Sequence, residues 1–154
     1  MKLLFYYARQ PNSTWLDRLI AKVDGGVFSH VEIITAQYDQ YTHTRGCHAG
    51  RGGVTTGLYT EPIDRFMVLE AHSEVFSDSE VLTRALQIKG SYSYLGALKT
   101  VFKWIPKSMV GYCCSTWVAT VLGIDNPKNI GIKDLYFIVM ESNTANAAAK
   151  EKIE

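Results

Sequence analysis

The pattern of apolar and polar positions predicts short β-strands in the first half of the chain. Residues 2–8 (KLLFYYA) and 65–72 (RFMVLEAH) are short runs of apolar, aromatic and β-branched residues, which favour strands. Residues 27–35 (VFSHVEIIT) combine β-branched residues with an alternation of apolar side chains. Each of these runs has the length of a strand in a small sheet.

The residues that follow the strand at 27–35 are predicted to turn the chain back. Residues 36–46 (AQYDQYTHTRG) are polar and predict a loop, and residues 47–50 (CHAG) predict a short returning strand. The glycines of residues 49–57 (AGRGGVTTG) indicate a turn or bulge before another short strand. Two hairpin-like returns in succession predict an antiparallel sheet.

Apolar residues at helical spacing predict four helices. The four segments are 12–26, 77–90, 91–106 and 113–125. Side chains that can cap a helix stand at the start of the first two: Asn12, Ser13 and Thr14, and Ser77 and Asp78. Residues that end a helix stand at or near the end of each segment: Gly25, Gly26, Gly90, Pro106 and Gly123.

The C-terminal part is harder to assign from its pattern. Residues 134–142 (DLYFIVMES) form an apolar run that predicts a last strand, with a short helix as the alternative. The tail at about 143–154 is polar and helix-prone, and we expect it to fray. A strand, a helix, several strands and then helices predict one α+β domain over residues 1–154, with an antiparallel sheet.

Composition and charge narrow the functional classes. The chain has 154 residues, 47% of them hydrophobic, which is enough to build a core. A formal net charge of +1 gives no reason to expect a nucleic-acid partner. Three cysteines are an odd number and too few for a disulfide framework. No segment resembles a signal peptide or a membrane span, so we expect a cytoplasmic protein without stable membrane insertion.

Two adjacent cysteines in residues 111–125 (GYCCSTWVATVLGID) stand at the predicted start of a helix. Buried free cysteines often behave as small apolar side chains, which is the simple alternative for Cys113 and Cys114. A thiol at a helix N-terminus, however, lies near unpaired N–H groups and the positive end of the helix dipole. Such surroundings activate a thiol and can stabilise an oxyanion, so Cys114 is a candidate nucleophile that needs a base.

His30 is the candidate base, because it opens a strand directly after a glycine-containing loop. Glu32 lies two residues further along the same face, and His48 comes beside His30 if the two strands pair. Glu70 is another residue that could orient the imidazole and stabilise its protonated form. The alternatives are a strand histidine bonded to a neighbour and strand glutamates that face solvent.

A metal site is the competing interpretation of the same region. It would use His43, Cys47, His48 and one of the paired cysteines. These residues lack the recurrent paired-ligand spacing of structural zinc sites. We therefore expect neither a metal nor an organic cofactor.

Three segments resemble the permuted branch of the NlpC-type papain-like superfamily. Residues 13–35 (STWLDRLIAKVDGGVFSHVEIIT) resemble its entry segment, a helix and a glycine-containing loop before a strand that opens with Ser-His. Residues 112–124 (YCCSTWVATVLGI) resemble its nucleophile helix, and residues 89–102 (KGSYSYLGALKTVF) the aromatic-glycine segment before that helix. The histidine precedes the cysteine, which is the order that the permutation produces. The resemblance spans residues 13–123.

The resemblance implies a circularly permuted papain-like fold, in which the nucleophile helix is packed against an antiparallel sheet. It places the nucleophile on Cys114, the base on His30 and the third polar residue on His48. His48 follows His30 at a greater distance than is usual, because the intervening loop is long, so Glu70 stays as a substitute. The family helix commonly carries an acidic residue after Cys-Ser, where this chain has Thr116.

The resemblance also implies a chemistry. His30 takes the thiol proton, and Cys114 attacks an amide, ester or thioester carbonyl to form a thioacyl-enzyme. The backbone N–H of Cys114 and the hydroxyl of Tyr112 would stabilise the oxyanion.

Three functions are compatible with these residues. The first is a cysteine hydrolase of amide bonds, a peptidase or amidase acting on a small peptide or cell-wall peptide. The second is an acyltransferase or thioesterase with lipid or thioester substrates, and the third is a binding module without catalysis. Residues 98–107 (LKTVFKWIPK) carry three lysines and suit either a membrane surface or a core helix with a basic edge. A small catalytic domain of this kind suits a bacterial or phage-encoded protein.

Overall fold

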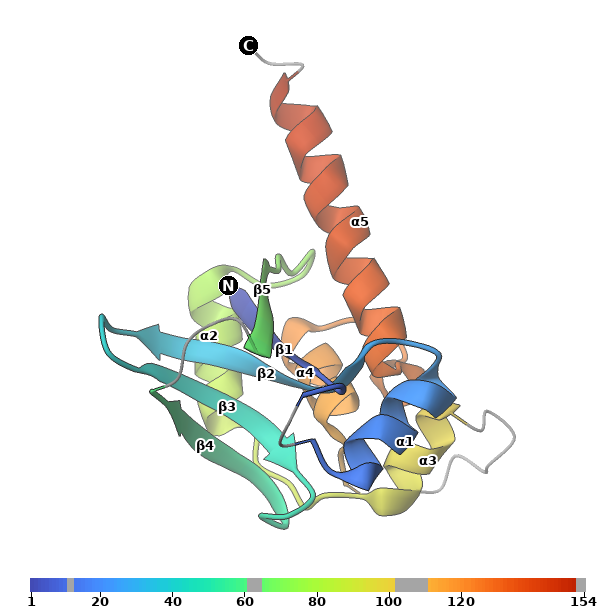
Figure 1. The fold of residues 1–154 in the computed structure, drawn as a ribbon. Helices are drawn as coiled ribbons and strands as arrows, with labels where there is room; N and C mark the ends of the chain where they lie inside the picture. The colour runs from blue at the N-terminus through green and yellow to red at the C-terminus, as the bar shows by residue number, and fades with distance from the viewer. Residues whose placement is uncertain (11–12, 61–64, 102–110, 152–154) are drawn as a thin grey trace.

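A five-stranded antiparallel sheet in the order β4-β3-β2-β1-β5 is the frame of the structure. The computed structural model describes residues 1–10, 13–60, 65–101 and 111–151. Along the chain the elements are β1 (Lys2–Tyr7), α1 (Trp15–Asp24), β2 (Phe28–Gln37), β3 (Thr42–His48), β4 (Gly53–Tyr59), β5 (Phe66–Glu70), α2 (Asp78–Gln87), α3 (Tyr94–Val101), α4 (Cys114–Leu122), η2 (Pro127–Asn129) and α5 (Ile132–Glu151) (Figure 1). The predicted α+β class with an antiparallel sheet is confirmed.

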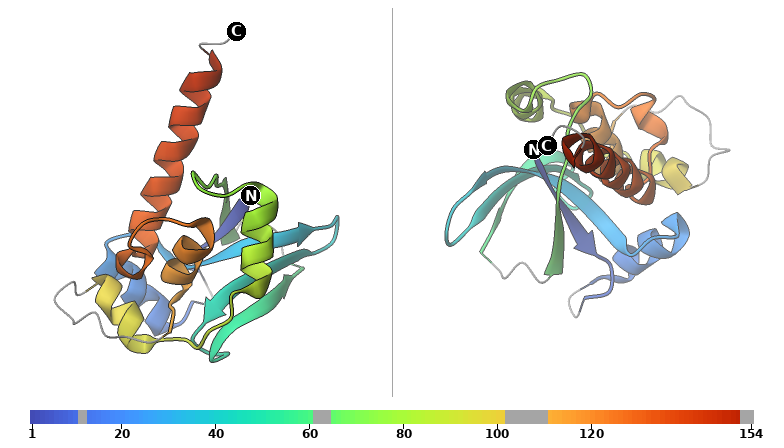
Figure 2. Two further views of the ribbon diagram at one scale, coloured as in Figure 1. Left: turned by 180° about the vertical axis from the view of Figure 1, so that it is seen from behind. Right: turned by 90° about the horizontal axis from the view of Figure 1, so that it is seen from above.

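The sheet is curved, and α2, α4 and α5 lie along one of its faces (Figure 2). Alternate residues of the strands point to this face and form the core with α4. The strand residues include Leu3, Phe5, Val31, Ile33 and Cys47, and those of α4 include Trp117, Val118 and Val121. Burial of α4 between the sheet and two other helices fixes where its first residue, Cys114, lies.

The opposite face of the central strands is polar at one end. The register pairs Leu4 with Glu32 and Tyr6 with His30, so that all four side chains share this face. Beyond β2, the pairing of β3 with β4 adds further residues to the face that carries Glu32 and His30. These are Thr44 opposite Gly57, Gly46 opposite Thr55, and His48 opposite Gly53.

A β-bulge in β2 lies immediately before His30. Tyr6 pairs with His30 but Tyr7 pairs with Phe28, so Ser29 is the extra residue. The bulge reverses the alternation, because Phe28 and Val31 both belong to the core although three positions separate them. It thereby directs Phe28 into the core and leaves His30 on the polar face.

Side-chain caps define the starts of α1 and α2. Thr14 caps α1 and forms a capping box with Asp17, and Ser77 does the same for α2 with Glu80. Gly25 and Gly123 end α1 and α4 with φ of 68° and 74°, a left-handed conformation that glycine adopts without strain. Of the caps proposed for the first helix, Asn12 lies outside the described residues.

The loop predicted at 36–46 is wrong in extent. β2 continues to Gln37 and β3 begins at Thr42, which leaves a turn of four residues. Tyr41, Thr42 and Thr44 are β-formers, and pairing with two neighbouring strands outweighs the polar character of the segment. The returning strand is therefore much longer than the predicted 47–50, and His48 is its last residue.

The strand predicted at 134–142 is also wrong, because these residues belong to α5. Ile132, Leu135 and Val139 are buried at helical spacing against the core. Phe137, Ile138 and Met140 are exposed, so the segment is apolar on every side and its periodicity does not reveal the helix. The tail continues α5 to Glu151, and this end of the helix extends away from the sheet (Figure 1).

The helix predicted at 91–106 is described from Tyr94 to Val101, and its expected end before Pro106 lies outside the described residues. The same is true of most of the lysine-bearing segment 98–107. Across the parts of the chain that the structure describes, no helix is both long and apolar enough to cross a bilayer.

Candidate active site

Cys114 is the first residue of α4 and lines a cleft of about 660 Å³ together with His30 and His48. Its N-cap is Cys113, whose N–H donates to the hydroxyl of Thr116 at 2.9 Å. Thr116 thus does what a glutamate does at the third position of a capping box. Cys114 therefore lies at the helix N-terminus, where backbone N–H groups have no partner within the helix.

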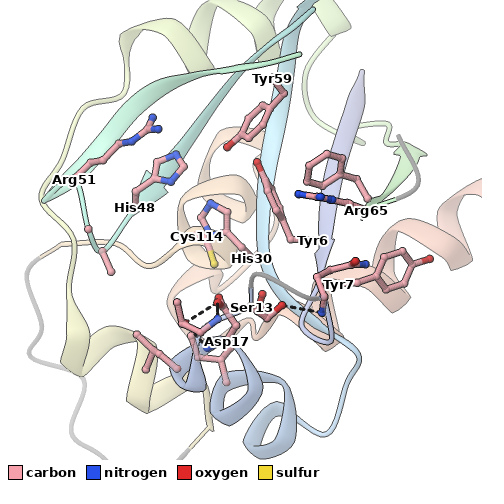
Figure 3. A pocket seen from close by; sticks show the side chains of 18 of the residues that line it. Tyr6, Tyr7, Ser13, Asp17, His30, His48, Arg51, Tyr59, Arg65 and Cys114 are labelled. Atoms are coloured by element: carbon pink, nitrogen blue, oxygen red, sulfur yellow. Dashed lines mark hydrogen bonds between the residues drawn. The ribbon is translucent and has the colours of Figure 1, made fainter. Parts of the chain in front are cut away.

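The imidazole of His30 joins this thiol to a carboxylate. The Nε2 of His30 lies 3.1 Å from Oε1 of Glu32. Figure 3 shows the ring beside the sulfur of Cys114, with His48 on one side and Tyr6 on the other. Burial alone would lower the pKa of His30, but its interactions with the charge of Cys114 and with Glu32 raise it to about 10.

Glu32 is completely buried and is surrounded by hydrogen-bond donors. The hydroxyls of Tyr6 and Tyr59 each donate to its Oε1 at 2.9 Å, and the hydroxyl of Thr44 donates to Oε2. Burial would raise the pKa of this carboxyl, but the hydrogen bond and charge of His30, with smaller effects of His48 and Thr44, lower it to about 2. Glu32 is thus an ionised carboxylate facing a protonated imidazole.

Two glycines on neighbouring strands leave the room that the Glu32 side chain occupies. A Cβ at Gly46 would lie 2.6 Å from Cγ of Glu32. A Cβ at Gly57 would lie 2.6 Å from the hydroxyl oxygen of Thr44 and 3.3 Å from Oε2 of Glu32. Neither glycine has a positive φ, so the close approach of Glu32 is what requires them.

His48 is close to the pair but differs from His30 in charge. Its Nε2 lies 3.4 Å from Oε1 of Glu32, and the two imidazole centroids are 4.7 Å apart. Within the described part of the chain, this buried Nε2 has no hydrogen-bond partner. Burial lowers the pKa of His48 to about 4, because the charges of His30 and Arg51 offset the attraction of Glu32. At neutral pH His48 is therefore uncharged beside a charged His30.

The structure brings Cys114, His30, Glu32 and His48 together, but not the other two sequence candidates. Glu70 is exposed and lies opposite Lys2, whereas Phe66 lies opposite Tyr6 at the site. Four strand positions separate Glu70 from Phe66, a distance of about 13 Å along β5. Tyr112 does not line the cleft, since its ring lies against Gly90. Tyr92 lines it instead, and burial and the charge of Cys114 raise the pKa of this phenol.

The other two cysteines are buried thiols with different surroundings. Cys113 contacts the hydroxyls of Ser115 and Thr116 at 3.5 and 3.4 Å, and burial raises the pKa of Cys113. Cys47 lies in the core and donates to the carbonyl of Tyr112 at 3.4 Å, and burial raises the pKa of Cys47 to about 12. Both thiols therefore stay protonated at neutral pH.

The metal site considered from the sequence is not assembled. His43 packs against the rings of Tyr38 and Tyr41, away from the buried Cys47. Among the described residues, His30, Glu32 and His48 are the group whose donor atoms all lie within 4.8 Å of one another, as a metal would need. The oxygens of Glu32 already accept hydrogen bonds from three hydroxyls and from His30, so an ion would have to displace these donors.

Comparison with models of known protein families gives no match. A search of curated proteins and a search of solved structures also give none. The function proposed below rests on the residues and distances of the site itself.

The hydroxyls around Glu32 could not be identified from the sequence. Tyr6 lies on β1 and Tyr59 on β4, two strands that are not neighbours, and only the curvature of the sheet brings both phenols to one oxygen. A weak signal was present in Glu32 itself, an acidic residue inside a strand of β-branched residues. Gly46 and Gly57, within otherwise β-forming segments, were a second signal of a close approach.

Removal of the buried carboxylate should destabilise the protein. Glu32→Ala leaves a buried cation and three hydroxyls without their acceptor, so we expect the free energy of unfolding to fall by roughly 3–5 kcal/mol. Urea denaturation followed by circular dichroism measures the change. Glu70→Ala, which removes an exposed strand glutamate, is the matched control and should change it by less than about 0.5 kcal/mol. Equal midpoints for the two variants would refute the assigned role of Glu32.

The two histidines should give opposite pH dependences of stability. The pKa of His48 is lower in the folded protein than in the unfolded chain, so its contribution is present above about 6.5 and is lost towards pH 4. The pKa of His30 is raised, so its contribution is present below about 6.5 and is lost towards pH 10. Thermal unfolding from pH 4 to 10 tests this.

We expect His48→Gln to flatten the acid side of the thermal-unfolding profile between about pH 4.5 and 6.5. His30→Gln should flatten the alkaline side. A wild-type midpoint that does not change with pH across either window would contradict the corresponding charge state.

Proposed function

We propose that the protein is a cysteine-dependent hydrolase of amide bonds, with Cys114 as nucleophile, His30 as base and Glu32 as the residue that orients His30. The observation that carries the proposal is the position of the His30 ring, which lies beside the sulfur of Cys114 (Figure 3) and, through Nε2, contacts the carboxylate of Glu32. A nucleophile, a base and a third group that orients the base are the arrangement that thiol catalysis requires.

The proton transfers follow from the contacts of the ring. Nε2 of His30 is held by Glu32, which leaves Nδ1 to exchange a proton with the Cys114 thiol. The thiolate adds to the amide carbonyl, and the oxyanion is stabilised by the N–H of Cys114 at the start of α4. His30 then protonates the leaving amine and later removes a proton from the water that hydrolyses the thioester.

Glu32 and His48 contribute in different ways. The ionised carboxylate of Glu32 stabilises the imidazolium that forms at each proton transfer and fixes the ring by a hydrogen bond. His48 stays neutral and fills the wall of the cleft beside His30. The sequence resemblance gave His48 the orienting role, with Glu70 as a substitute. Glu32 was a further candidate from its place on the same face of the strand as His30, and the contacts favour Glu32.

The fold supports the proposed relationship to permuted papain-like enzymes. The nucleophile opens a helix that is packed against an antiparallel sheet, and the base lies on a strand that precedes this helix in the chain. We propose on this basis that the domain is a circularly permuted papain-like fold. A cytoplasmic location and a bacterial or phage origin stay predictions of the sequence.

Acyl transfer or thioester hydrolysis is the second candidate, because it needs the same nucleophile and base. The observation in its favour is an apolar cavity of about 400 Å³ that also reaches Cys114. A small or cell-wall peptide would bind mainly in the cleft that contains His30 and His48. A binding module without catalysis has no need of a histidine held between a thiol and a carboxylate.

The alkylation rate of each cysteine tests the proposed pair. We expect iodoacetamide at pH 6 to modify Cys114 before Cys47 and Cys113, because Cys114 lines the cleft beside a protonated imidazole. His30→Ala should slow this reaction by roughly tenfold to a hundredfold, since an unpaired thiol is mostly protonated at pH 6. Mass spectrometry of peptides after timed quenching gives the rate at each site.

Cys113→Ala is the matched control, because it removes the adjacent thiol and keeps the pair. It should retain the wild-type rate at Cys114 and any amidase activity found in a substrate screen, whereas Cys114→Ser and His30→Ala should lose that activity. Preferential modification of Cys113 or Cys47, or an unchanged Cys114 rate in His30→Ala, would overturn the proposal.

A further inference from the structure

Cys114 lies where two hollows of different character meet. One is the cleft that contains His30 and His48, called the polar cleft because it also holds the ionisable side chains of Asp17, Arg51 and Arg65 among apolar residues. The other is the apolar cavity of about 400 Å³. The residues that line both are Leu16, Ile20, Ser29, Tyr92 and Cys114. A substrate bound across this junction would place one part of its structure in each hollow, with the bond to be cleaved at the sulfur.

The cavity is walled mainly by α1. Trp15, Leu19 and Val23 lie on one side of this helix and line the cavity, and they are 75%, 44% and 38% exposed. Tyr94 of α3 and Ile132 of α5 line it from the other elements. The walls are therefore apolar and open to solvent, which is unfavourable for a surface that no ligand covers.

α1 contributes little to the core of the protein. Ala21 is the buried residue of this helix and Ile20 packs partly against the core, whereas Trp15, Leu19 and Val23 stay exposed beside the cavity. An amphipathic helix normally buries its apolar side against its own domain. In the described structure, that side of α1 instead borders a hollow that ends at the proposed nucleophile.

We propose that this cavity binds the apolar acyl chain of the substrate, so that the protein hydrolyses amides of medium- or long-chain fatty acids. The inference rests on the proposed function and specifies its substrate. The Cys114 sulfur bonds to the acyl carbon while the C–N bond breaks, and the amine leaves through the polar cleft with the proton from His30. Water then cleaves the thioester to the fatty acid and the free thiol.

The cavity explains why the acyl side, and not the amine side, carries the apolar group. The polar cleft contains the base that must protonate the leaving nitrogen. The released amine is polar and hydrated, so it suits this cleft better than the apolar cavity. The hydrocarbon chain gains free energy by leaving water for the apolar walls.

Alkyl chloromethyl ketones of increasing chain length test the inference at Cys114. The sulfur displaces chloride from these reagents, and their alkyl chain lies on the carbonyl as in an acyl group. We expect the heptyl ketone to alkylate Cys114 roughly a hundredfold faster than chloroacetone, since each buried methylene contributes up to about fourfold. The ratio of the two rate constants is the quantity to measure.

Leu19→Glu places a charge in the cavity wall, and Leu86→Glu is the matched control on α2, where an equally exposed leucine lies outside the cavity. Leu19→Glu should reduce the ratio to near one, and Leu86→Glu should keep the wild-type ratio. Trp15→Glu is a second variant with the same expectation, at a position exposed enough to leave folding intact. Circular dichroism checks the fold of each variant.

The outcomes separate this inference from the proposed function. If chloroacetone modifies Cys114 in a His30-dependent manner but the ratio in wild type is near one, the acyl site is refuted and the hydrolase proposal stands. If chloroacetone shows no His30 dependence, the hydrolase proposal fails first. If the ratio of the two rate constants is near one and the protein forms a dimer that Leu19→Glu abolishes, the cavity belongs to an interface with a second copy. If the ratio is near one and the protein binds phosphatidylcholine vesicles in a way that Leu19→Glu abolishes, the cavity belongs to a membrane-binding surface.

Discussion

The charge of a single buried residue, Glu32, organises this site. A carboxylate without solvent is tolerated only when donors and a cation surround it, and here four strands supply them. The same contacts hold the imidazole of His30 in place and keep it protonated. The stability of the fold and the proposed reactivity are therefore linked, because the group that the fold must neutralise is the group that the proposed base needs.

The site also requires that the N-terminus of α4 lies at the polar end of the sheet, where it brings Cys114 to His30. α4 is packed so completely that its first residue has little freedom, and the bulge at Ser29 keeps His30 on the polar face. The segment around Tyr92 runs beside Tyr112, and Tyr92 lines the cleft together with Cys114. Rigid elements rather than long loops thus position both members of the pair, which favours a fixed geometry.

Sequence patterns identified the residues whose signal is local. The start of α4 at Cys114 and the cap of α1 at Thr14 follow from short-range capping, and His30 follows from its place after a glycine loop. Residues 134–142 were assigned to a strand, with a short helix only as the alternative, because this part of α5 is apolar on all sides. The hydroxyls around Glu32 were missed because they depend on long-range structure: the register of β2 with β3 brings Thr44 to the carboxylate, and the curvature of the sheet brings Tyr6 and Tyr59. Long-range shape of this kind leaves no periodic trace in a sequence.

The space beside Glu32 has a consequence for how this sequence can vary. Gly46 and Gly57 have ordinary backbone angles, so no turn demands them. The atoms nearest to a Cβ at Gly46 all belong to Glu32, whereas a Cβ at Gly57 would first meet the hydroxyl of Thr44 and the ring of Tyr59, two partners of the carboxylate. A chain that replaced Glu32 by a smaller residue would therefore free position 46 to accept alanine or serine, and position 57 only after Thr44 and Tyr59 had changed as well. Loss of the glycine at position 46 should thus accompany loss of Glu32, and would mark a descendant that has lost the proposed orienting carboxylate while keeping the fold.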